Sequence, residues 1–155
     1  MPFQLFHSLF PELAERETRS ITVLPHSEHN LPPGQYGFLE MFCDEPGCDC
    51  RRAFFMVMAS FRQQPQAFVA WGWEDLEFYR RWMHDDFMDA RDLQGPILNF
   101  GSPETELSPA ILELARTVLL ADPNYVERVK RHYGLFRNAV ETKAASRVRK
   151  KRPHR

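Results

Sequence analysis

The chain of 155 residues contains only three cysteines and no long hydrophobic run. No apolar segment approaches the roughly 18 to 20 residues that a membrane helix needs. Residues 1–10 lack the basic and then apolar pattern of a signal peptide. Three clustered cysteines are also too few for a disulfide framework. We therefore expect a cytoplasmic protein that does not enter a membrane.

Common catalytic signatures are missing as well. The sequence contains no G-x-S-x-G, no G-x-x-x-x-G-K-[ST], no H-E-x-x-H and no G-x-G-x-x-G. Its paired acids, such as Asp85 with Asp86, fit solvated charge better than an acid and base pair. The motifs thus favour a protein that is not an enzyme.

What is present fits one folded domain with a tail. The chain is 43% hydrophobic, 13% aromatic and 26% charged, which is enough to build a core. Residues 143–155 hold seven Lys or Arg and no acid, whereas residues 1–142 carry a net charge of −8. We predict a folded domain over 1–142 and a basic, disordered tail over 143–155. Two functions are compatible with that tail: it solubilises the chain, or it binds nucleic acid phosphates weakly.

Three segments predict an antiparallel meander. Residues 36–43, 52–61 and 67–73 are rich in aromatic and β-branched side chains and are separated by short turns. Residues 21–24 predict one further strand, followed by a loop over 25–34.

Helical periodicity dominates the rest of the chain. It predicts a short helix over 9–19 and an amphipathic helix over 74–89. After an irregular connection over 95–103, Ser108 and Pro109 begin a helix that continues over 111–120. A last helix is expected over 123–144, with Gly134 as a kink or an early stop. The fold class is therefore α+β: a small antiparallel meander packed against C-terminal helices, with a metal-binding hairpin loop.

The chemically distinctive segment is FCDEPGCDCRR. It gathers all three cysteines, Cys43, Cys48 and Cys50, within eight residues at a hairpin tip. Three such thiolates would repel one another without a cation, and tetrahedral Zn²⁺ suits a tight loop of this kind. Arg51 and Arg52 would offset the excess negative charge. We predict one structural Zn²⁺ per chain, although a thiolate-rich site also admits iron.

A closed zinc site needs a fourth ligand, and His132 is the first choice. Tyr125, Val129, His132, Phe136 and Ala139 are spaced four, three, four and three apart, which places His132 on the apolar seam of the last helix. An inward-facing histidine is otherwise a hydrogen-bonded core residue. The alternative ligands are His26, His29, Asp44 and Asp49.

Two functional classes follow from this cluster. The first is a small zinc-stabilised binding or adaptor module for an unknown protein partner. The second is a zinc-dependent or thiol-redox enzyme that uses Cys43, Cys48 and Cys50. An exchangeable metal ligand or a redox-active thiol pair would favour the enzyme.

The segments YGFLEMFCDEPGCDCRR (36–52), GWEDLEFYRRW (72–82) and RHY (131–133) resemble an uncharacterised bacterial protein family. The resemblance spans about residues 30–137, and its cysteine segment is the specific part. It implies a bacterial cytosolic protein with this cysteine loop and a matching His132, but it implies no activity. The basic tail lies outside it.

Overall fold

Six antiparallel strands form one sheet in the part of the chain that the computed structural model describes, residues 3–84 and 88–152. Their order is β1-β3-β4-β5-β6, and β2 pairs with the part of β3 that β1 leaves free. The strands are β1 Phe3–Leu5, β2 Arg19–Val23, β3 Gly34–Cys43, β4 Arg52–Ala59, β5 Ala67–Gly72 and β6 Ile97–Leu98.

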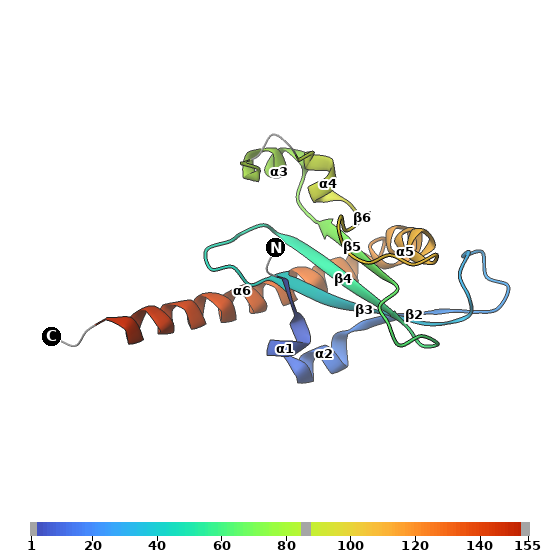
Figure 1. Cartoon of the computed structure of the whole chain (residues 1–155), viewed down its shortest axis with the longest axis horizontal. Coiled ribbons are helices and arrows are strands. Elements are labelled where there is room, and N and C mark those ends of the chain that lie inside the picture. The colour runs from blue at the N-terminus through green and yellow to red at the C-terminus, as the bar shows by residue number, and fades with distance from the viewer. Residues whose placement is uncertain (1–2, 85–87, 153–155) are drawn as a thin grey trace.

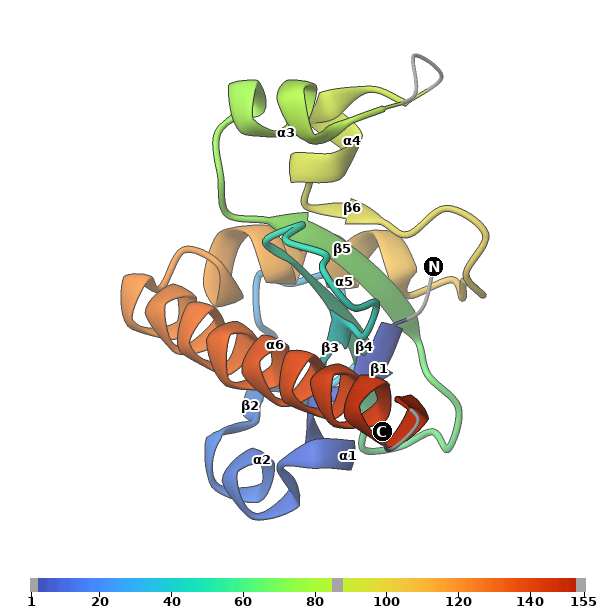
Figure 2. The same cartoon turned by 90° about the vertical axis from the view of Figure 1, so that its left-hand side faces the viewer.

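The helices lie between and after the strands (Figures 1 and 2). They are α1 Phe6–Leu9, α2 Pro11–Glu17, α3 Leu76–Trp82, α4 Ala90–Gln94, α5 Ser108–Leu114 and α6 Pro123–Lys151. A π-helical turn, η1 Ala115–Leu119, continues α5. None of these described helices is both long enough and apolar enough to cross a bilayer.

Strand alternation gives the sheet two different faces. Phe38, Phe42 and Phe55 lie on the face that packs against Val129 and Phe136 of α6, and all five are fully buried. In Figure 1, α6 passes behind β3 and β4. The opposite face carries half-buried apolar side chains: Leu39, Met41, Met56, Met58 and Phe68.

The structure confirms the α+β class and the three-strand meander. It adds β1 and β6, which the sequence did not predict, and a short helix, α1, before the helix expected over 9–19, which is α2. In place of the helix expected over 74–89, α3 begins at Leu76 and ends at Trp82. It ends there because the backbone of Met83 is in the extended conformation. Part of that prediction, residues 85–87, lies outside the described residues.

The last helix differs most from its prediction. α6 runs without a break through Gly134 and continues to Lys151, so residues 143–151 are helical although we expected a disordered tail. Nearly all side chains in this last part are exposed. Figure 1 shows it projecting beyond the sheet. Good helix formers, mainly Ala, Lys and Arg, sustain the helix there without packing.

Candidate metal centre

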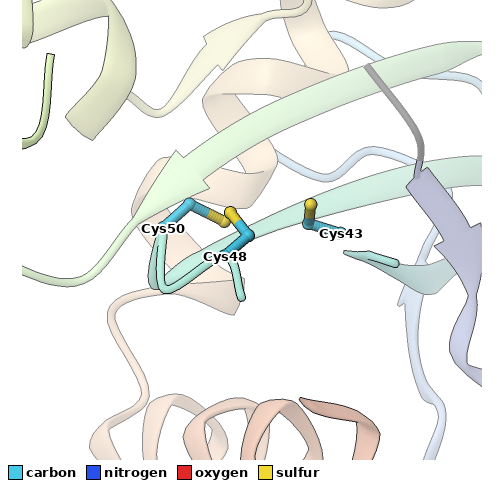
Figure 3. A group of neighbouring side chains, drawn as sticks. All are labelled: Cys43, Cys48 and Cys50. Carbon is cyan, nitrogen blue, oxygen red and sulfur yellow. The ribbon is translucent and has the colours of Figure 1, made fainter. Parts of the chain in front are cut away.

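The three cysteines meet where β3 ends and β4 begins. Cys43 is the last residue of β3, and the loop over 44–51 returns Cys48 and Cys50 to it (Figure 3). The three sulfur atoms all lie within 4.8 Å of one another. Cys43 and Cys50 are buried, Cys48 is half-buried, and none forms a disulfide. The sequence thus correctly predicted a cluster that is close enough to hold one metal ion.

The loop reverses direction through two residues in the left-handed region. Gly47 has φ 78° and Arg51 has φ 50°. Glycine adopts this conformation freely, whereas arginine needs support from its surroundings. The backbone of Arg51 has that support: its N–H donates to the hydroxyl of Tyr133 at 3.1 Å, and its carbonyl accepts from the hydroxyl of Tyr79 at 2.8 Å.

Helix α6 fastens the other half of the loop. The guanidinium of Arg137 donates to the carbonyls of Cys43 at 2.7 Å and Glu45 at 2.9 Å. The Glu141 carboxylate accepts from the N–H of Gly47 at 2.6 Å and also pairs with Arg137. Side chains therefore satisfy loop backbone groups that the sheet cannot pair.

The thiols share their protons unequally. A hydrogen bond from Cys50 lowers the pKa of Cys43 to about 6, despite the opposing effect of burial. Burial raises the pKa of Cys48, and the hydrogen bond with Cys43 raises that of Cys50. These shifts favour the thiolate form at Cys43, with its two neighbours as hydrogen-bond donors. A metal ion would replace these protons, since metals bind the thiolate form.

The structure does not bring His132 into this cluster. Its Nδ1 lies 2.7 Å from Glu40, its Nε2 lies 3.4 Å from Glu17, and its ring stacks on Phe6 with the ring centres 4.4 Å apart. Both nitrogens are therefore engaged by carboxyl groups. The apolar spacing along the last helix correctly predicted that His132 faces inward. Its contacts are those of the alternative interpretation, a hydrogen-bonded core histidine.

The other candidate ligands are not part of the cluster either. Asp49 is held away by Tyr133, whose hydroxyl donates to it at 3.0 Å, and by Arg51 at 2.9 Å. Asp44, His26 and His29 do not join the three thiols. Over residues 3–84 and 88–152, no fourth Cys, His, Asp or Glu completes the group.

The two arginines after the cluster behave differently. Arg51 forms ion pairs with Asp49 and with Glu74. Arg52 is only 4% exposed, and burial lowers its pKa. Charge compensation at the cluster by either arginine stays a prediction.

Sequence reasoning missed the side chains that hold the loop, above all Arg137, Tyr79 and Glu141. One signal was available for Arg137. It follows the buried Phe136 and precedes Val140 on the apolar seam of α6, where a charged residue must find partners.

No protein-family model, no curated protein and no solved structure matches the chain. The resemblance to a bacterial family in the cysteine segment stays a prediction.

Proposed function

We propose that the protein binds one Zn²⁺ per chain through Cys43, Cys48 and Cys50 and that the metal has a structural role. The convergence of the three sulfur atoms within 4.8 Å carries this proposal. Zinc-to-sulfur bonds of about 2.3 Å place tetrahedral thiolates about 3.8 Å apart, so a small contraction of the cluster suffices. The bound ion would tie the end of β3 to the start of β4 and reinforce the loop that α6 already supports.

The fourth coordination position is assigned to a donor from outside the described residues, either solvent or a group of a bound partner. Such a position suits a binding module, in which a partner completes the site. It also provides the observation that favours the second candidate, a zinc-dependent enzyme, because catalytic zinc keeps one exchangeable ligand. Three thiolates weigh against the enzyme, since their charge makes zinc a poor activator of water.

A thiol-redox function has less support from the same geometry. The low pKa of Cys43 gives a thiolate, but its side chain is only 3% exposed. A nucleophile that attacks an external disulfide must be accessible. Cys48 is the more accessible thiol, yet burial raises its pKa.

Metal analysis tests the proposal. Protein purified without chelator or metal affinity resin should contain about one zinc, and X-ray absorption should show three sulfur neighbours and one lighter atom. Replacing Cys43, Cys48 or Cys50 by Ser should each remove most of the zinc. His132→Gln is the matched control and should retain it. Absence of metal, or full zinc content in the Ser variants, would overturn the proposal.

Cobalt substitution separates the two candidates. Co²⁺ in place of zinc should give intense visible bands typical of a tetrahedral site with thiolate ligands. If added thiol or cyanide does not change these bands, the site is closed and structural. A rapid spectral change would show an exchangeable fourth ligand, which the enzyme requires and which the binding module has only while no partner occupies that position.

A further inference from the structure

A cavity of about 750 Å³ is lined by residues of β1, β4, α4 and β6. Its walls are largely apolar: Phe3 of β1, Phe54 of β4, and Ile97 and Leu98 of β6. Met88 and Phe100 also line it and are exposed to solvent, Phe100 by 98%. The volume and the lining are typical of a site for a small organic molecule.

Arg52 is the cationic group that lines this cavity. Its side chain lines the cavity, lies over the ring of Phe54 at 5.0 Å, and is only 4% exposed. Its Nε donates to the carbonyl of Leu93 at 2.8 Å. Among residues 3–84 and 88–152, neither Nη atom has a hydrogen-bond partner and no carboxylate lies within 4.0 Å of the guanidinium.

The unpaired Nη atoms keep some exposure, because no fully buried side-chain nitrogen among the described residues lacks a partner, and they are open to a hydrogen-bond acceptor that enters the cavity. Asp92 lines the same cavity, yet its side chain is exposed and remains solvated. The cavity therefore offers free hydrogen-bond donors for an anion at Arg52.

We propose that this cavity binds a small amphipathic carboxylate. Its oxygen atoms accept hydrogen bonds from the Nη atoms of Arg52, a pairing for which a guanidinium is well shaped. Its hydrocarbon part lies against Phe3, Phe54 and Ile97, where transfer from water contributes the rest of the affinity. The cavity neighbours the zinc centre, since Phe3 pairs with Cys43 and Arg52 follows Cys50 by two residues, so octanoate binding and zinc content are measured separately in the same variants.

Calorimetric titration with octanoate tests this assignment. The full-length protein should bind one octanoate, and 1-octanol, which has the same chain without the charge, should bind at least about tenfold more weakly. Arg52→Met keeps an unbranched apolar stem and should weaken octanoate binding by about tenfold or more. Arg51→Met removes the neighbouring, solvent-facing guanidinium and should change the affinity by less than about twofold.

Three results would overturn the proposal: no octanoate binding, equal binding of octanoate and octanol, or unchanged binding by Arg52→Met. Zinc content is measured in every variant. An Arg52→Met protein that loses zinc but keeps octanoate would assign Arg52 to the thiolates alone. If that variant does not fold, Ile97→Trp fills the cavity from the edge strand and must abolish octanoate binding, and retained binding would then refute the site.

Discussion

Replacing His132 by Ala separates the two roles that its position on α6 allows. As a core residue, His132 stabilises the fold and has no effect on metal content. As a zinc ligand, it would affect metal content first. The contacts with Glu40 and Phe6 predict the first outcome.

The magnitude follows from what the substitution removes. Glu40 is 5% exposed and would keep one partner, the hydroxyl of Tyr125 at 3.2 Å. Losing a hydrogen bond to a buried carboxyl group costs about 1.5 to 3 kcal/mol. The lost stacking on Phe6 adds about 1 kcal/mol, and the cavity adds more. We expect the free energy of unfolding to fall by about 4 kcal/mol, which lowers Tm by roughly 10 °C for a chain of this length.

Urea unfolding, followed by circular dichroism with and without zinc, measures this change. Zinc should increase the stability of wild type and His132→Ala by the same amount, because a ligand of unchanged affinity adds the same free energy to both. His84→Ala, at an exposed histidine, is the matched control and should shift stability by less than about 0.5 kcal/mol. If His132→Ala does not fold, His132→Gln retains an amide donor and should be destabilised less.

One result would refute the reasoning. If His132→Ala had nearly normal stability without zinc but gained none when zinc was added, the histidine would be a ligand in solution. The geometry around Glu40 would then have to rearrange on metal binding.

Three further predictions concern other parts of the fold. Gly72→Ala should destabilise by about 2 kcal/mol and weaken zinc binding, because the new methyl group would meet the Tyr79 hydroxyl that holds the cysteine loop; urea unfolding and zinc titration measure both effects. The hydrogen bond from Arg131 lowers the pKa of Glu17 to about 2, so its contribution, about 1 kcal/mol after solvent screening, is present above pH 4.5 and lost as the pH falls towards 2. Glu17→Gln should therefore reduce the loss of stability over that range, and a pH dependence identical to wild type would contradict the pairing. Truncation after Thr142 should leave urea stability within about 0.5 kcal/mol while far-ultraviolet dichroism loses helix, since the removed side chains are almost all exposed.

The sequence predicted the centre of the sheet well and its edges poorly. Strands β3, β4 and β5 each bury large aromatic side chains, such as Phe38 and Phe55, and this composition can be recognised from the sequence alone. β1 and β6 contain three and two residues. These short strands form only because a longer strand lies beside them, as β3 places Cys43 opposite Phe3. The residues of a short strand alone do not predict such a neighbour.

The candidate site was predictable to the same partial extent. The cysteine cluster is local in sequence, so spacing alone revealed it. Glu40, the partner of His132, is 92 positions away in the sequence. Its one signal is the strand pattern, which places this acid on the same face as Phe38 and Phe42, where apolar residues are expected. A buried carboxyl group and an inward-facing histidine satisfy each other by a hydrogen bond, which a metal ion elsewhere in the fold does not provide.

The projecting end of α6 makes the molecule a permanent electric dipole. Residues 143–151 carry five basic side chains and no acid, and at 1.5 Å per residue they extend about 14 Å along the helix axis. Residues 1–142 are negative by eight charges. Since screening at physiological salt acts over about 8 Å, an approaching charged surface senses the two ends separately. A negatively charged surface would therefore meet this protein with the tip of α6 first and its acidic body turned away.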